Sequence, residues 1–174
     1  MTKGDPIPFN RPARTEFELE YLSAVLRSGH LSGNGPFTKR CQAWFERRYE
    51  NRCLLTTSAT SALELSALLA RIGPGDEVIV PTYTFVTTAS AFLLRGAKVV
   101  FADSEEATPN LDVQAVANLI SPRTKAVVPV HYAGISCDMD PLVELCRDAG
   151  VLVIEDAAQA VDAYYKGRRL GGIG

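Results

Sequence analysis

Three groups of residues in this chain have the chemical types needed to hold a phosphorylated planar ring. The first is Ser58, Ala59 and Thr60, where hydroxyls and a small side chain precede a segment of helical periodicity. Backbone N–H groups at a helix start lie at the positive end of the helix dipole and suit a phosphate dianion. A purely structural alternative is N-capping by Ser61, which forms a capping-box pattern with Glu64.

The second and third groups follow apolar runs later in the chain. Phe85 comes shortly after EVIVP, where an aromatic ring could stack on a planar heteroaromatic ring or simply pack in the core. Glu155 and Asp156 follow VLVI, and only one of them can face a given pocket because neighbours on a strand point to opposite faces. A carboxylate such as Asp156 could keep a pyridine-type nitrogen protonated and the ring electron-poor. A helix cap or a surface charge is the alternative reading of Asp156.

The elements that must position these residues form an alternating pattern. From about Arg52, β-branched runs alternate with helical periodicity, which predicts an α/β fold of three layers with a mainly parallel sheet. Strands are expected near residues 53, 77, 97, 125 and 151, with helices starting near Ser61, Phe85, Leu111 and Asp140. Ligands bind at the carboxyl ends of parallel strands, so the three groups are expected at one edge of the sheet.

The two ends of the chain have a different character. Before Arg52, two amphipathic helices over 16–28 and 39–49 are expected around the loop HLSGNGP. This predicts a helical segment over 1–51 and a partial α/β domain over 52–174. The last residues, YYKGRRLGGIG, contain a turn pattern without a closing helix or strand, so we expect the chain to end within its fold; a flexible tail is the alternative.

Composition narrows the range of partners. The chain has 174 residues, 47% of them apolar and 22% charged, which suits one domain with a hydrophobic core. A net charge of −2 gives no electrostatic sign of a nucleic-acid or membrane partner. No apolar leader or run of about 18 apolar residues occurs, so a cytoplasmic location is expected. The four cysteines form no C-x-x-C pair, so we expect reduced thiols and no metal site.

Four motifs in order carry a family resemblance. They are TSATSALEL, GDEVIVPTYTFVTTASA, VPVHYAG and IEDAAQA. Together they resemble the DegT/DnrJ/EryC1/StrS family of sugar-nucleotide aminotransferases, over residues 7–174. The resemblance implies the large domain of a fold-type-I transferase that depends on pyridoxal 5'-phosphate. Segments 7–10 and 32–38 resemble family members that act on nucleotide-linked 4-keto-6-deoxy sugars.

The resemblance also implies roles for individual residues. It assigns the phosphate cup to Ser58, Ala59 and Thr60, ring stacking to Phe85, the pyridinium partner to Asp156, the neighbourhood of the phenolic oxygen to Gln159, and pocket lining to His131. As a lone histidine, His131 could equally be a hydrogen-bonded structural residue. The implied partners are a nucleotide sugar, an amino donor such as glutamate and a second copy of the chain, with neither nucleic acid nor membrane.

The resemblance implies that the Schiff-base lysine and the smaller C-terminal domain lie beyond Gly174. The five lysines present are Lys3, Lys39, Lys98, Lys125 and Lys166, and none is expected at the carboxyl end of a strand. We therefore expect residues 1–174 alone to be inactive. Two alternatives stay open: a dehydratase of the same fold with histidine in place of the lysine, and a non-catalytic α/β module that binds a ligand or a partner protein.

Overall fold

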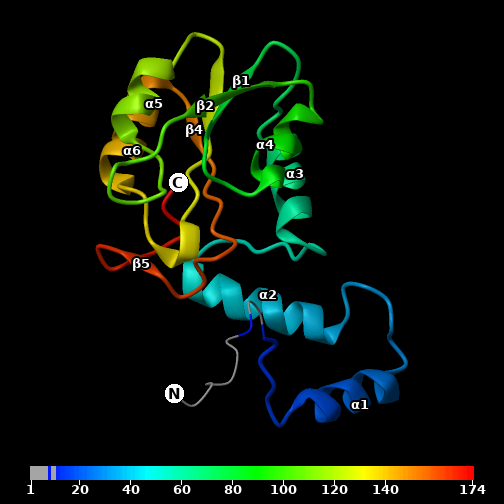
Figure 1. The fold of residues 1–174 in the computed structure, drawn as a ribbon. Coiled ribbons are helices and arrows are strands. Elements are labelled where there is room, and N and C mark those ends of the chain that lie inside the picture. Colours follow the sequence, from blue (N-terminus) through cyan, green and yellow to red (C-terminus); the bar gives the residue numbers. More distant parts are fainter. Residues whose placement is uncertain (1–7, 9–10) are drawn as a thin grey trace, which may run out of the picture.

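The computed structural model describes residue 8 and residues 11–174, so most of segment 7–10 lies outside the described residues. In chain order the elements are α1 (Glu18–Ser28), α2 (Pro36–Tyr49), α3 (Ala59–Leu69), β1 (Glu77–Pro81), α4 (Val86–Leu93), β2 (Lys98–Ala102), α5 (Val113–Leu119), β3 (Thr124–Val127), the 3₁₀ turn η1 (Tyr132–Gly134), α6 (Met139–Ala149), β4 (Leu152–Val153), β5 (Tyr164–Tyr165) and β6 (Arg168–Arg169). Figure 1 shows their arrangement.

The main sheet has four parallel strands in the order β2-β1-β3-β4. The chain leaves β1 toward β2 and leaves β3 toward β4, in opposite directions. Right-handed crossovers therefore place α4 on one face and α6 on the other, and a crevice opens where β1 and β3 end. A parallel bridge between Val130 and Asp156 extends the β3–β4 pairing to this edge. The predicted α/β class with a parallel sheet is confirmed.

Helices cover both faces of the sheet, which gives the three predicted layers (Figure 1). On the face of α3 and α4, Val78 and Val80 of β1 pack with Phe92 in one hydrophobic cluster. On the face of α5 and α6, Ile79 packs with Leu142 in a second cluster. The alternation along β1 follows from the two-residue period of a strand, and burial on both faces explains its continuous apolar run.

The strand expected near residue 53 is not formed. The backbone of Cys53 instead bonds to side chains of α2: its N–H donates to Glu46 Oε1 at 3.2 Å, and its carbonyl accepts from Gln42 Nε2 at 3.2 Å. Leu54 and Leu55 are exposed. The prediction was wrong because these backbone groups have partners other than a neighbouring strand.

The start of α3 also differs from the sequence pattern. The N-cap is Ser58, whose hydroxyl accepts from the N–H of Ser61 at 3.1 Å, so Ser61 is not the cap. Ser58 has extended backbone angles, and its Oγ satisfies the N–H group three residues ahead. The capping box with Glu64 was therefore assigned three residues too late.

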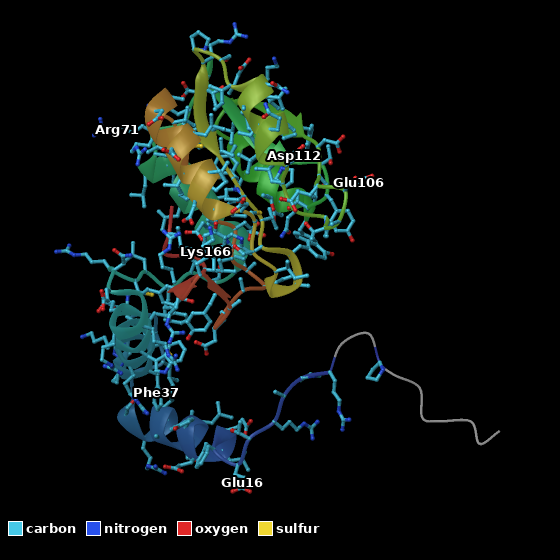
Figure 2. The ribbon with its side chains drawn as sticks, turned by 90° about the vertical axis from the view of Figure 1, so that its left-hand side faces the viewer. Glu16, Phe37, Arg71, Glu106, Asp112 and Lys166 are labelled. Atoms are coloured by element: carbon cyan, nitrogen blue, oxygen red, sulfur yellow. The ribbon has the colours of Figure 1, made fainter. Side chains whose placement is uncertain are left out.

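A short antiparallel hairpin forms near the C-terminus, where no strand was expected. Strands β5 and β6 flank Lys166 and Gly167, both of which have positive φ, at 47° and 82°. When both central residues of a two-residue turn have positive φ, the twist of the turn fits the right-handed twist of the two flanking strands. The predicted Lys-Gly turn is thus correct, and Figure 2 shows Lys166 at the end of the α/β body that faces α2.

Helices α1 and α2 lie at one end of the α/β body (Figures 1 and 2). Neither helix has a fully buried residue, and Leu19, Leu22 and Leu26 of α1 are exposed. An apolar groove of about 480 Å³ runs beside Phe37 and Trp44, away from the sequence-predicted site. Among the described residues, no helix has the length and hydropathy to cross a membrane.

Candidate cofactor-binding site

A pocket of about 410 Å³ lies at the carboxyl end of the parallel sheet. Its lining comes from the start of α3, the β1–α4 junction, η1 and the segment after β4: Ala59, Thr60, Leu63, Tyr83, Thr84, Phe85, Thr87, Tyr132, Asp156, Ala158 and Gln159. Five of the seven sequence-predicted site residues are in this set. Ser58 and His131 lie beside it. The topology brings these residues together because strand ends of a parallel sheet share one edge.

One wall of the pocket is the start of α3. Ala59 and Thr60 are the first residues of the helix, and their N–H groups have no intrahelical acceptor because the helix begins there. Thr60 Oγ1 donates to Thr87 Oγ1 at 3.1 Å, which ties α3 to α4. Ser58 caps the helix in place of Ser61, which was the cap that the sequence pattern indicated. A helix start with free N–H groups and small side chains can receive a phosphate.

Phe85 forms an open aromatic surface on the other side of the pocket. It is the N-cap residue of α4, and its side chain is 68% exposed, so it is not a core residue. Tyr83 and Tyr132 make an edge-on pair nearby, with ring centroids 4.8 Å apart. The hydroxyl of Tyr83 hydrogen-bonds to Tyr132 and raises the pKa of Tyr132.

The carboxylate of Asp156 is buried at the base of the pocket. Thr88 Oγ1 donates to its Oδ2 at 2.7 Å, and the N–H of Ala158 donates to its Oδ1 at 3.2 Å. The residue is 8% exposed and does not begin a helix, so it is neither a surface charge nor a helix cap. Each carboxylate oxygen can accept a further hydrogen bond, which leaves capacity for one ring N–H donor.

Glu155 points to the other side, as the strand alternation predicted. Its carboxylate accepts from the N–H groups of Gly171, Ile173 and Gly174 at 2.6 to 2.7 Å. Burial raises the pKa of Glu155, but hydrogen bonds from His131 and from these backbone groups outweigh it and hold the pKa below its usual value. Glu155 therefore organises the C-terminal segment, and Asp156 faces the pocket.

His131 has both ring nitrogens engaged. Nε2 lies 2.8 Å from Glu155 Oε2, and Nδ1 accepts from the N–H of Cys137 at 3.3 Å. Because Nδ1 accepts, Nε2 carries the proton that it donates to Glu155. The side chain is fully buried, so His131 has the arrangement of a hydrogen-bonded structural residue, which was one of the two readings of the sequence. The residue also borders a hollow of about 40 Å³ beside the pocket.

Gln159 lines the pocket and also fixes its rim. Its Oε1 accepts from the N–H of Ala133 at 2.7 Å, and Ala133 has a positive φ of 54°. This bond links the segment after β4 to η1. No acceptor among the described residues takes up the amide nitrogen of Gln159, so this group can donate to a ligand.

Sequence reasoning missed Tyr83, Thr84, Thr88 and Tyr132 as site residues. All four belong to quoted motifs, yet their role depends on contacts between elements that spacing does not reveal. Thr88 is the clearest case, because its partner Asp156 is 68 residues away. The density of hydroxyls in TYTFVTT was the signal that could have pointed to Tyr83, Thr84 and Thr88.

Residues 12–174 match the DegT/DnrJ/EryC1/StrS aminotransferase family. The chain belongs to this family. The match covers nearly the whole chain, including every residue of the pocket.

Solved structures of similar proteins agree with the family. The aminotransferase TlmJ from Streptoalloteichus hindustanus is 41% identical with a TM-score of 0.88, over 94% of this chain and 45% of that one. An aminotransferase from Psychrobacter cryohalolentis is 36% identical with a TM-score of 0.91, over 96% and 43%. Spr1654 from Streptococcus pneumoniae, described as a sugar aminotransferase, is 32% identical in its PLP form with a TM-score of 0.90, over 97% and 47%. The chain spans less than half the length of each.

The residues that line the pocket fit pyridoxal phosphate, the cofactor that this family of aminotransferases uses. The pocket combines free N–H groups at the start of α3, an exposed aromatic face and a buried carboxylate with accepting capacity. Lys39 lies on α2, Lys98 and Lys125 lie at the starts of β2 and β3, and Lys166 lies in the hairpin turn. Within the described part of the chain, no lysine lines the pocket. Likewise, no cluster there could hold a metal ion.

Proposed function

We propose that this chain supplies the cofactor-binding part of an aminotransferase that moves an amino group, from glutamate or a similar donor, to the keto carbon of a nucleotide-linked 4-keto-6-deoxy sugar. The observation that carries the proposal is the convergence of Ala59, Thr60, Phe85 and Asp156 on one pocket. The family membership and the similarity to aminotransferases support it.

The chain's own residues would act by holding the cofactor in one orientation. The start of α3, with Ser58, Ala59 and Thr60, would bind the phosphate; Phe85 would lie against the ring; and Gln159 would contact the phenolic oxygen. Asp156 would hold the proton on the ring nitrogen. Bound pyridoxal phosphate supplies an electron-poor ring that stabilises negative charge next to the amino nitrogen.

Within the family, we propose that the whole protein acts as a dTDP-4-amino-4,6-dideoxygalactose transaminase in the synthesis of surface polysaccharides or lipopolysaccharides. The loop Ser32–Thr38 before and into α2 supports this likeness, as does segment 7–10, which lies mostly outside the described residues. The donor and the sugar nucleotide would meet the cofactor at the open side of the pocket, near Tyr83 and Tyr132.

The division of the chain and its self-association are parts of the same proposal. Residues 1–51 would form a helical segment and residues 52–174 a partial cofactor-binding domain. In support, both hydrophobic clusters of the sheet are built from residues after Arg52. The exposed leucines of α1 would be covered in a homodimer, because apolar patches of this kind favour contact with a partner.

The test is an assay of the purified whole protein with glutamate and a dTDP-linked 4-keto-6-deoxyhexose, with the amino sugar product identified by mass. We expect formation of an amino sugar and of 2-oxoglutarate in equal amounts. Loss of water from the sugar without amino transfer would instead establish the dehydratase. Absence of both reactions with every keto-sugar nucleotide would contradict the proposal.

Cofactor binding provides a second test that does not depend on the substrate. We expect saturable binding of pyridoxal phosphate, measured by its absorbance, and a weakening of about tenfold or more in Asp156→Ala, because a charge pair is lost. The matched control is Asp148→Asn, an exposed acid at the end of α6. Equal binding by both variants would contradict the assignment of Asp156.

A further inference from the structure

We propose that Thr88 is a positioning residue for Asp156: its hydroxyl holds the carboxylate in the orientation that meets the ring nitrogen of the cofactor. The inference rests on the proposed function, since it assumes that Asp156 binds that nitrogen. It adds a residue on a different element, α4, to the machinery that controls the cofactor.

The hydrogen bonds around Thr88 have a fixed direction. Thr88 is fully buried in the first turn of α4, and its Oγ1 lies 2.7 Å from Asp156 Oδ2. A carboxylate can only accept, so Thr88 donates its single hydroxyl proton to Asp156. The hydroxyl of Thr84 lies 2.8 Å from Thr88 Oγ1 and must therefore be the donor in that pair. The result is a directed chain from Thr84 through Thr88 to Asp156.

The main chain of Asp156 does not need Thr88. Its N–H donates to the carbonyl of Pro129 at 2.9 Å, and its carbonyl accepts from the N–H of His131 at 3.1 Å. These two bonds fix the backbone against the extension of β3. Within the described part of the chain, the carboxylate, in contrast, accepts only the longer bond from Ala158 besides that from Thr88. Removing the Thr88 hydroxyl therefore frees rotation of the side chain and leaves the backbone in place.

Thr88 is also well suited to act as a rigid support. Its β-branched side chain has few rotamers available in a helix, so the hydroxyl is held in place before a ligand arrives. Thr84, which donates a hydrogen bond to Thr88, lines the pocket. Hydrogen bonds in a chain polarise one another, so the bond from Thr84 strengthens the donation to Asp156.

The experiment compares Thr88→Val, which keeps the shape and removes the hydroxyl, with Thr88→Ser, which restores it. In the purified whole protein we expect Val to weaken the binding of pyridoxal phosphate about tenfold, and Ser to bind within about threefold of the natural protein. Thr88→Ala serves as a second variant that also lacks the hydroxyl. The control is Thr124→Val at the opposite end of the sheet, where a buried hydroxyl accepts from Ser121 N–H at 2.8 Å. It should leave cofactor affinity unchanged.

A double-mutant cycle separates positioning from packing. If Thr88 acts through the carboxylate, Thr88→Val has no further effect on cofactor affinity in an Asp156→Ala background. The absorbance spectrum of bound cofactor in Thr88→Val should also shift toward that of Asp156→Ala. An equal loss in both backgrounds, or failure of Ser to rescue, would overturn the inference while Asp156 kept its role. No effect of Asp156→Ala itself would overturn both the inference and the site assignment.

Discussion

The carboxylate of Glu155 and the imidazole of His131 form a buried pair, with Oε2 and Nε2 2.8 Å apart. The same carboxylate accepts three backbone N–H groups from residues 171–174. Glu155 and Asp156, which follow β4, thus have different roles. Asp156 faces the pocket, and Glu155 joins the sheet to the C-terminal segment.

Replacing Glu155 with Gln should destabilise the fold. The amide offers one acceptor oxygen where the carboxylate offers two, so some of the four donors around it lose their partner. We expect a loss of about 2–4 kcal/mol in the free energy of unfolding, measured by chemical denaturation. Glu144→Gln, an exposed acid on α6, should change it by less than about 0.5 kcal/mol. A loss no larger than this in Glu155→Gln would show that the buried network contributes little.

Stability in acid should depend on Glu77 at the opposite edge of the sheet. Hydrogen bonds from Ser121, Arg123 and Lys98 lower the pKa of Glu77 from 4.5 to about 2. Because the folded pKa is depressed, this stabilisation is complete above pH 4.5 and is lost as the pH falls through about 2. Glu77→Gln should be less stable than the natural protein near pH 6, and the difference should shrink toward pH 2. Denaturation midpoints across this range, with Asp148→Asn as control, test the expectation.

Phe85 should contribute to cofactor affinity and little to stability, because most of its ring is exposed. We expect Phe85→Ala to weaken the binding of pyridoxal phosphate about three- to tenfold, the range for a stacked aromatic pair. Phe101→Ala is the matched control, since Phe101 is also exposed but lies on the edge strand β2. Equal affinity in the two variants would argue against stacking.

Ser58 offers a way to separate helix capping from phosphate binding. Ser58→Asp keeps an N-cap acceptor, so stability should stay within about 0.5 kcal/mol, whereas the added negative charge should weaken binding of pyridoxal phosphate at least tenfold. Asp112→Ala removes the N-cap of α5, so it should cost about 1 kcal/mol without changing that affinity. Unchanged affinity in Ser58→Asp would place the phosphate elsewhere.

Residues 1–174 alone should bind pyridoxal phosphate without a covalent bond to the chain. The basis is the absence of a lysine around the pocket in the described part of the chain. Borohydride reduction with the cofactor, followed by peptide mass analysis, should give only scattered, substoichiometric labelling. A single stoichiometric adduct on Lys39, Lys98, Lys125 or Lys166 would mean that the pocket is assigned wrongly.

Local patterns in the sequence determined much of the fold. The apolar runs of β1 and β2 and the start of α4 directly after Phe85 fall where periodicity predicted them, because burial in a sheet and helical spacing leave direct traces in residue order. The alternation of side chains along a strand also predicted that Glu155 and Asp156 point to opposite sides. The predicted parallel topology placed the candidate residues at one edge of the sheet.

Tertiary structure alone decided the features that depend on partners distant in the chain. Cys53 is not in a strand because α2 binds its backbone, and His131 is fixed by Glu155 and Cys137. The support of Asp156 by Thr88 joins residues 68 positions apart. Such hydrogen bonds follow from how helices and strands pack against one another, and residue order by itself carries no record of which donor meets which acceptor.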